Sequence, residues 1–385
     1  MRSRPGSPGC IAKVAGSLVH VIDTGGPGGA ETVYARLVSG LSERGWPGIP
    51  VVSREGWLSG TLRTAGHAPV ILTGRGSFQW RLARELVRLA RHHQAHALVT
   101  HLYGSAIYGS AAGLVAGRPV VGVFHGQTDV ALPGRFRGAK RWLVRRGLVA
   151  AVAVSEGLRR DLDSQLALSP ARWRVIPNGI AVEQFDQATP LGLRRRFGLS
   201  AGDILIGALG NVRRPKGYAD LLRAAAILRG GSVPVHVVVA GEARGKLTDE
   251  LLALRQELGL EPRVHFLGLV DQVPSFLAEL DLFVSSSTSE GFSIACVEAM
   301  AAGLPVVATR SGGPEEIVLP GETGLLVPVS DPEALAAALA DLAANPNLRR
   351  RMGEAGQQRA RKTYSLDAML DAYEAVLYEV TAPAR

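Results

Sequence analysis

Two carboxylates eight residues apart are the residues in this sequence whose types and spacing best fit a chemical role. They are Glu290 and Glu298, in residues 289–300, which read SEGFSIACVEAM. An apolar run at 281–285 precedes them, so the pattern predicts a strand, a loop with Glu290 and a helix that contains Glu298. Backbone N–H groups at a helix start lack intrahelical partners and attract anions. The expected anion site is the backbone of Phe292, Ser293 and Ile294.

A nucleotide sugar presents its groups in the order that this segment would bind them: sugar hydroxyls, a diphosphate and ribose hydroxyls. Ligands of open α/β sheets bind at the carboxyl ends of the strands, where the loop of Glu290 is expected. Two carboxylates at this spacing also occur by chance, and a solvated helix face is the alternative for Glu298. Asp281, at the start of the predicted strand, is expected at the strand edge and outside the site.

A basic turn forms a second candidate phosphate site. Residues 211–217 read NVRRPKG, follow the apolar run at 203–210 and open a predicted helix. Arginine can hold two phosphate oxygens at once and lysine supplies a compact charge, so the turn suits a diphosphate. We expect Lys216 and Arg213 to contact the donor, and a solvated basic turn is the alternative, which applies more to Arg214 than to Lys216.

The first half of the chain offers a glycine-rich loop and two histidines. Residues 25–31 read GGPGGAE, and Gly28 and Gly29 would let the backbone approach a ligand. The loop does not fit the G-x-G-x-x-G pattern of dinucleotide-binding proteins. His125 ends the predicted strand at 119–124, where it can hydrogen-bond a hydroxyl or stabilise charge. His101 ends the preceding strand and is a second candidate, and a structural role is the alternative for both.

These segments resemble the retaining family-4 glycosyltransferases of the GT-B fold, also called glycosyl transferases group 1. The Glu-x7-Glu element is followed, as in that family, by AMAAGLPVVAT at 299–309, SGGPEEI at 311–317 and ETGLLV at 322–327. The resemblance covers nearly the whole chain, from residue 18 to about residue 377.

The resemblance implies roles for the residues of the second half. Glu290 would contact the hydroxyls of the donor sugar, and Glu298 would contact the ribose. Lys216 matches the family lysine. Asn211 stands where family members commonly carry arginine, so Arg213 is expected to supply the missing guanidinium.

In the first half, Gly28 and Gly29 match the glycine-rich loop that lines the cleft near the donor phosphates and the acceptor, and His125 matches the family histidine. The implied catalytic residues are His125, Glu290, Arg213 and Lys216. The implied donor-binding residues are Gly28, Gly29, Asn211, Arg213, Lys216, Glu290, Phe292, Ser293, Ile294 and Glu298.

The resemblance also implies a retaining transfer from a nucleotide sugar, expected to be a UDP-sugar, to a sugar, lipid-linked or small-molecule acceptor. Because no side chain is an obvious covalent nucleophile, we expect a front-face reaction without a metal or other cofactor. A GT-B nucleotide-sugar epimerase and a non-catalytic nucleotide-sugar-binding protein are the alternatives. A metal-dependent GT-A enzyme is disfavoured, because the only Asp-x-Asp pair, Asp161 and Asp163, lies in a helical pattern.

The elements that would position these residues predict an α/β protein with two doubly wound, Rossmann-like domains facing a central cleft. Expected strands in the first half lie at 18–23, 48–53, 69–73, 97–101, 119–125 and 149–155, and in the second half at 203–210, 233–240, 264–267, 281–285, 305–309 and 325–329. The predicted parts are a loose tail (1–16), an acceptor-side domain (17–186), a nucleotide-sugar-binding domain (187–363) and a C-terminal helix (364–385) that packs back toward the first domain.

Charge is unevenly distributed along the chain. Residues 1–186 hold 23 Lys and Arg against 11 Asp and Glu, a net +12, whereas residues 187–385 hold 20 against 23, a net −3. The first half therefore suits an anionic partner, such as a phosphorylated acceptor or a membrane surface, or is simply Arg-rich with solvated charges. A nucleic-acid binder is the least favoured class, since only the basic charge indicates it.

The basic stretch at 134–148, GRFRGAKRWLVRRGL, holds six cations and an apolar stripe with Trp142. Such a stretch can lie on an anionic membrane or can pack on the sheet. The only cysteines, Cys10 and Cys296, make no disulfide framework, and no apolar run is long enough to span a bilayer. We therefore expect a cytoplasmic protein, with peripheral association with the inner face of the membrane as an open alternative.

Overall fold

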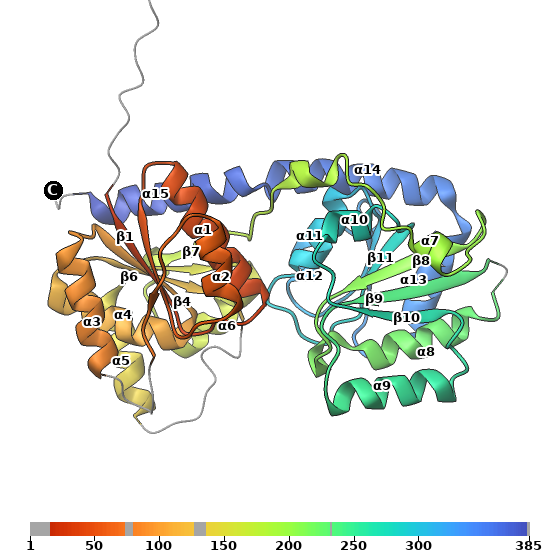
Figure 1. Ribbon diagram of the computed structural model, residues 1–385, viewed down its shortest axis with the longest axis horizontal. Helices are drawn as coiled ribbons and strands as arrows, with labels where there is room; N and C mark the ends of the chain where they lie inside the picture. The colour runs from red at the N-terminus through yellow and green to blue at the C-terminus, as the bar shows by residue number, and fades with distance from the viewer. Residues whose placement is uncertain (1–15, 74–79, 127–135, 232, 383–385) are drawn as a thin grey trace, which may run out of the picture. The chain divides into compact units, whose positions relative to one another are not determined.

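The computed structural model describes residues 16–73, 80–126, 136–231 and 233–382 (Figure 1). The chain divides into two compact units, each with one parallel sheet. Unit 1 comprises Met1–Val152, Leu162–Arg174 and Leu370–Arg385, and unit 2 comprises Ala153–Asp161 and Val175–Met369. Most of the expected tail, and with it Cys10, lies outside the described residues.

The sheet of unit 1 has the strand order β3-β2-β1-β4-β5-β6-β7. Its strands are β1 (Leu18–Ile22), β2 (Gly48–Val52), β3 (Val70–Ile71), β4 (Ala97–His101), β5 (Val120–Phe124), β6 (Leu148–Ala153) and β7 (Trp173–Val175). Every residue of β1, β4 and β5 is buried, as expected for central strands of a parallel sheet that is covered on both faces.

Helices follow most of these strands. They are α1 (Gly29–Glu43), α2 (Trp57–Thr64), α3 (Trp80–His92), α4 (Leu102–Ala116), α5 (Arg137–Gly147), α6 (Glu156–Leu166) and the 3₁₀ turn η2 (Pro170–Arg172). Helices α3, α4 and α5 pack side by side (Figure 1). Among the described residues, no helix combines the length and the apolar character needed to cross a bilayer.

The sheet of unit 2 has the strand order β10-β9-β8-β11-β12-β13. Its strands are β8 (Ile204–Leu209), β9 (Val235–Ala240), β10 (Val264–Gly268), β11 (Leu282–Ser285), β12 (Val306–Thr309) and β13 (Gly324–Val327). Its helices and turns are η3 (Val182–Phe185), α7 (Leu193–Arg196), η4 (Arg214–Lys216), α8 (Tyr218–Leu228), α9 (Lys246–Glu257), α10 (Val273–Leu277), α11 (Ile294–Ala301), α12 (Pro314–Ile317), α13 (Pro332–Ala344) and α14 (Pro346–Thr363).

Both sheets have a point where the direction of winding reverses. In unit 1 this switch lies between β1 and β4, and in unit 2 it lies between β8 and β11. Ligands of open α/β sheets bind at the carboxyl ends of the strands on either side of such a switch. The loops after β1, β8 and β11, which carry Gly28, Lys216 and Glu290, begin at these strand ends.

The last helix, α15 (Leu366–Thr381), begins in unit 2 and continues into unit 1. In unit 1 the Arg44 side chain contacts the carboxylates of both Asp371 and Glu374, and Trp46 Nε1 donates to Glu374 over 3.3 Å. A Cβ on Gly40 of α1 would lie 2.5 Å from a methyl carbon of Leu370, so a larger residue there would displace the Leu370 side chain where α15 approaches.

The predicted border at residues 186 and 187 lies inside unit 2, because the segment before it is bonded to unit 2. The N–H of Ile180 donates to Tyr364 O over 2.9 Å, and Leu366 N–H donates to Ile180 O over 2.7 Å. Arg361 pairs with Asp186. Strand β7 was not predicted.

Candidate functional site

An ion pair at the switch point of unit 2 brings two of the predicted residues together. Lys216 Nζ lies 2.6 Å from Glu290 Oε2, although the residues are 74 positions apart in the chain. Lys216 ends the turn after β8, and Glu290 lies in the loop after β11. Ser287 Oγ donates to the same carboxylate oxygen over 3.2 Å. Both charged side chains are partly exposed, at 25% for Lys216 and 18% for Glu290, so a ligand can reach them.

The two loops that carry this pair are bonded to each other. Ser286 Oγ donates to Lys216 O over 2.9 Å, and Thr288 N–H donates to Pro215 O over 2.7 Å. Gly217 has a φ of +62°, and a Cβ there would lie 2.0 Å from Ser286 O. Only glycine therefore allows this close approach without displacing the backbone that positions Lys216.

The loop of Glu290 is fixed from its other side by the glycines of the SGGP segment. Glu290 N–H donates to Ser311 O over 2.8 Å, and Gly313 N–H donates to Glu290 O over 2.7 Å. A Cβ on Gly313 would lie 2.6 Å from Phe292 Cα. Within unit 2, Ser155 Oγ also donates to Gly291 O over 2.9 Å. The main chain around Glu290 is thus held on both sides.

Helix α11 begins where the sequence predicts. Ser293 is its N-cap, with Oγ 3.4 Å from Cys296 N, Phe292 is buried before it, and Ile294 is its first residue. Glu298 lies inside the helix and is 9% exposed. The solvated-face alternative is therefore wrong for Glu298. A carboxylate that is almost fully buried needs a polar partner, which either the fold or a bound ligand can supply.

The remaining residues of the basic turn do not gather around the ion pair. Asn211 Oδ1 accepts from Glu242 N–H over 2.9 Å and so ties the turn to the loop after β9. The Arg213 side chain is exposed. Arg214 lies 3.7 Å from Glu250. Asp281, expected at the strand edge, contacts Arg194 and accepts from Leu205 N–H.

In unit 1, the two candidate histidines contact each other. His101 Nδ1 lies 3.1 Å from His125 Nε2, and the rings stack with centroids 5.3 Å apart. Burial lowers the pKa of His125 to about 4. Burial, the neighbouring His125 and His20 together lower the pKa of His101 well below its usual value. Both imidazoles are therefore neutral near pH 7.

The glycine-rich loop caps helix α1. Gly28 is the N-cap, its carbonyl accepts from both the N–H and the hydroxyl of Thr32, and Gly29 begins the helix. A Cβ on Gly28 would lie 2.4 Å from Glu31 Oε2. The Glu31 carboxylate in the first turn thus already offsets part of the positive end of the helix dipole, where an anionic ligand was expected.

Asp23 is a charged residue that the sequence reasoning missed. It follows β1 directly, at the switch point of unit 1, and burial, with a smaller contribution from Glu31, raises its pKa to about 6. A Cβ on Gly104 in α4 would lie 1.8 Å from Asp23 Oδ2. Its place at the end of a central strand is the signal that could have identified it.

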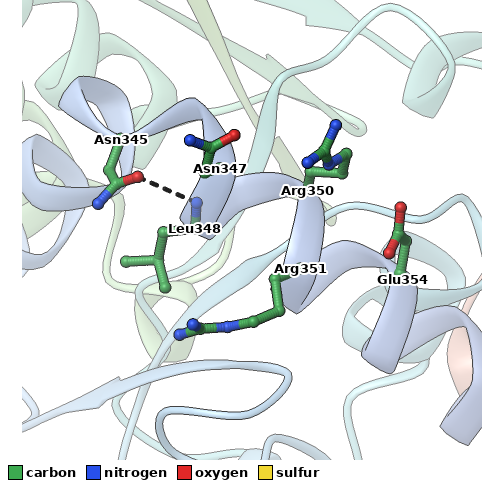
Figure 2. Close-up of a pocket in the computed structure, with 6 residues that line it drawn as sticks. All are labelled: Asn345, Asn347, Leu348, Arg350, Arg351 and Glu354. Carbon is green, nitrogen blue, oxygen red and sulfur yellow. Dashed lines mark hydrogen bonds between the residues drawn. The ribbon is translucent and has the colours of Figure 1, made fainter.

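A surface pocket of 560 Å³ lies elsewhere in unit 2, at the start of α14 (Figure 2). Asn345 Oδ1 accepts from Leu348 N–H there, as the N-cap of the helix. The pocket is lined by Asn345, Asn347, Leu348, Arg350, Arg351 and Glu354, none of which is a candidate residue. Among the described residues, no three His, Cys, Asp or Glu side chains are grouped to hold a metal ion.

Comparison with known proteins defines the class. The sequence model of the family described as "Glycosyl transferases group 1" matches residues 193–359, and that of "Glycosyltransferase Family 4" matches residues 27–184. HepE from Anabaena, crystallised with UDP and glucose, has the same fold, with a TM-score of 0.82 at 23% identity over 94% of this chain and 99% of that chain. The protein therefore has the two-domain, Rossmann-like GT-B fold.

Curated relatives agree with this assignment. The lipopolysaccharide core biosynthesis glycosyltransferase LpsE of Rhizobium meliloti (strain 1021) is 35% identical over 47% of this chain and 51% of its own length. The chain spans about half the length of the first curated relatives that it matches. D-inositol 3-phosphate glycosyltransferase of Corynebacterium glutamicum (strain R) is 30% identical over 93% of this chain and 81% of its own length. The chain belongs to the family of group 1 glycosyltransferases.

Proposed function

We propose that the protein is a retaining glycosyltransferase that moves a sugar from a UDP-sugar to an acceptor. The Lys216–Glu290 pair at the switch point of unit 2 is the observation that carries the proposal. A cation that suits a diphosphate lies in this pair beside a carboxylate that suits sugar hydroxyls, which supports the proposal. HepE, the structural neighbour with UDP and glucose, supports a uridine nucleotide as the first choice of donor.

In the proposed complex, a diphosphate oxygen takes the place of the Glu290 carboxylate beside Lys216. Glu290 is then free to accept hydrogen bonds from the donor sugar, while Glu298 binds the ribose. The start of α11, at Phe292, Ser293 and Ile294, adds N–H groups and a positive helix end for the diphosphate. Arg213, on the exposed side of the turn, closes on the diphosphate, and Asn211 holds the turn to which it belongs.

The proposed reaction proceeds on one face of the sugar. The acceptor oxygen bonds to the anomeric carbon on the side from which the diphosphate leaves, and a phosphate oxygen of the leaving group takes the acceptor's proton. The protein contributes by stabilising charge on the diphosphate through Lys216 and Arg213 and by hydrogen bonding from His125. The scheme requires no metal ion.

We propose that the acceptor is a sugar or a lipid-linked or anionic glycan precursor, held by the basic first half of the chain. The net +12 of residues 1–186 supports a partner with negative charge. LpsE and the inositol phosphate glycosyltransferase are named for glycan and phosphorylated substrates, which fits this choice.

A thermal-shift screen of UDP, GDP, UDP-glucose and GDP-mannose tests the donor site. UDP should raise the melting temperature, and Lys216→Ala should weaken nucleotide binding about 10- to 100-fold, because a charge-assisted hydrogen bond is lost. Arg214→Ala is the matched control from the same turn and should keep the wild-type shift. If Lys216→Ala keeps that shift as well, the proposed donor site is wrong.

A further inference from the structure

We propose that Ser155 is a positioning residue of the donor site: its hydroxyl holds the Gly291 carbonyl and so directs the Phe292 N–H to the diphosphate of a bound nucleotide. The proposal rests on the proposed function for the identity of that ligand. The hydrogen bonds that carry it are present in the protein without a ligand.

The Ser155 hydroxyl connects two segments of unit 2 that are far apart in the sequence. Its Oγ accepts from Leu158 N–H over 3.2 Å and donates to Gly291 O over 2.9 Å. The amide can only donate and the carbonyl can only accept, so each bond has one possible direction. A single hydroxyl, on a residue that is 2% exposed, thus links the start of α6 to the residue after Glu290.

Only one of these two bonds is explained by helix capping. Leu158 is the third residue of α6, and its N–H donates to Ser155 Oγ as in an ordinary N-cap, while Arg159 N–H donates to Ser155 O over 3.0 Å. Capping needs an acceptor, which an aspartate or asparagine side chain would also supply. The bond to Gly291 O needs a donor in addition, and the serine hydroxyl provides both.

Glu316 fixes the segment to which Ser155 belongs. Its Oε2 accepts from Glu156 N–H over 2.8 Å, and its Oε1 accepts from Gly157 N–H over 2.6 Å. A Cβ on Gly157 would lie 3.3 Å from Glu316 Oε1, so a larger side chain would crowd the carboxylate. Arg359 donates to Glu316 O over 2.9 Å and holds the residue from the side of α14. The first N–H groups of α6 are therefore bound by unit 2, and Ser155 has a fixed place beside Gly291.

The bond to Ser155 sets the direction of the next N–H group. No peptide bond among the described residues is cis, and in a trans peptide the carbonyl and the following N–H point in opposite directions. Because Gly291 O points to Ser155, the Phe292 N–H points away from it. Phe292 is 7% exposed, and its N–H bonds to no other residue that the structure describes. A buried backbone N–H rarely lacks a partner, so this donor is available to a ligand.

The free N–H lies where an anion is expected. Phe292 directly precedes Ser293, the N-cap of α11, so the N–H adds to the positive end of that helix. Glu290, two residues earlier, is bonded to Lys216 over 2.6 Å. A phosphate oxygen that binds Lys216 would meet the start of α11 next, and the Phe292 N–H can donate to it. Ser155 acts on the ligand through this peptide and need not touch it.

NMR of the full chain can observe this one peptide. Gly291 and Phe292 form the only Gly-Phe pair in the sequence, so ¹³C-carbonyl glycine with ¹⁵N-phenylalanine gives a single carbonyl–amide correlation. Ser155→Gly removes the hydroxyl and leaves an acceptable N-cap residue. The Gly291 carbonyl carbon should then shift upfield, because its hydrogen bond is lost. An unchanged carbonyl shift in Ser155→Gly would overturn the proposal.

Two further variants separate positioning from capping. Ser155→Asp can accept from Leu158 N–H but has no proton to donate, so it should shift the Gly291 carbonyl as Ser155→Gly does. Ser365→Gly is the matched control, because Ser365 Oγ accepts from Ala368 N–H over 3.2 Å at the start of α15. It should leave the signal in place. A wild-type signal in Ser155→Asp would mean that capping alone matters, and the proposal would be wrong.

Nucleotide titration tests the use of the N–H. UDP should move the Phe292 N–H signal of the wild type, whereas uridine, which has no diphosphate, should not. The dissociation constant of UDP should rise about three- to tenfold in Ser155→Gly and Ser155→Asp, with uridine affinity unchanged, because a hydrogen bond to a charged phosphate is weakened. Equal losses for UDP and uridine, or none for UDP, would contradict the proposal.

Failure of the proposed function would look different. A wild type that binds neither UDP nor GDP would contradict the proposed donor site. The carbonyl shift of Ser155→Gly would still decide whether Ser155 sets the peptide between Gly291 and Phe292.

Discussion

At the scale of single residues, the two carboxylates of the candidate site in unit 2 differ in their surroundings. Glu290 is bonded to Lys216 and Ser287 at the surface of the site, whereas Glu298 is buried four residues into α11. The two residues therefore meet different parts of the donor in the proposed complex, and their substitutions should differ in kind.

Glu290→Ala should lower turnover more than it weakens nucleotide binding, because its contact is to the sugar. Glu298→Ala should chiefly weaken nucleotide affinity, about tenfold, because it removes hydrogen bonds to the ribose. Steady-state kinetics and UDP titration measure the two effects. Glu333→Ala, an exposed carboxylate at the start of α13, is the control and should change neither. Identical behaviour of the two site variants would contradict this division of roles.

Residue chemistry in the sequence singled out the residues of the candidate site but could not predict their contacts. Glu290 and Lys216 each stood out by type and by place at a strand end. Their bond depends on β8 and β11 being neighbours in the sheet, which a pattern along one segment does not contain. Asp23 was missed because one carboxylate after a strand is unremarkable until α4 packs over it.

At the scale of elements, the basic helix α5 has some apolar residues that pack within unit 1 and others that are exposed to solvent. Val144 and Leu148 of the predicted apolar face are buried in unit 1, and Leu143 is half-buried. Phe136 and Trp142 remain exposed, at 61% and 62%. Gly134 and Arg135 of the predicted stretch lie outside the described residues. The helix therefore packs on its own unit and still leaves aromatic rings beside its cations.

We expect weak, salt-sensitive association of the protein with anionic vesicles through α5. Each basic residue near such a surface contributes about 1 kcal/mol, and salt screens the attraction. Changing Arg141, Arg145 and Arg146 to Ser should therefore abolish most of the sedimentation with anionic vesicles. The control changes the exposed Arg350, Arg351 and Lys362 of α14 to Ser and should sediment like the wild type. If the wild type does not sediment with anionic vesicles at low salt, a soluble acceptor becomes a better proposal than a membrane-bound one.

Element type was predictable because the buried strands are short β-branched runs between helical patterns. Strand β7 was not predicted because it has only three residues, of which Trp173 alone is buried. Strand order could not be read from the sequence. The helix at 366–381 was predicted because a serine cap precedes a periodic apolar pattern.

At the scale of the whole molecule, the tryptophans separate the two units for spectroscopy. All five lie in unit 1, at Trp46, Trp57, Trp80, Trp142 and Trp173. Tryptophan emission therefore follows the unfolding of unit 1 alone, which matters because two units need not unfold in one step.

Unit 1 should lose stability as the pH falls below about 6.5. Burial lowers the pKa of His20 to about 3 and that of His125 to about 4, and lowers that of His101 as well. The unfolded chain takes up these protons near pH 6.5 and the folded unit does not, so their contribution is complete above pH 6.5 and is lost toward pH 4. The pKa of Asp23 is raised to about 6, so this residue stabilises unit 1 as the pH falls below 6. Its effect is opposite to that of the histidines, but it is one group and they are three.

Urea unfolding followed by tryptophan emission at pH 7.5 and 4.5 measures this dependence. The midpoint should be lower at pH 4.5, and His125→Asn should reduce the difference between the two pH values. His92→Gln, at an exposed helix end, should leave that difference unchanged. A midpoint independent of pH would mean that the three histidines are not held neutral by the fold.

The contacts of α15 with the rest of unit 1 can form only at the end of the synthesis of the chain. Residues Leu370–Arg385 belong to unit 1, and Arg44 and Trp46 bond to Asp371 and Glu374 only once this helix exists. The ribosome makes unit 2 between the first part of unit 1 and the helix that covers it. While unit 2 is being translated, the emerging polypeptide therefore carries a first domain in which Leu370 does not yet cover the α1 surface at Gly40.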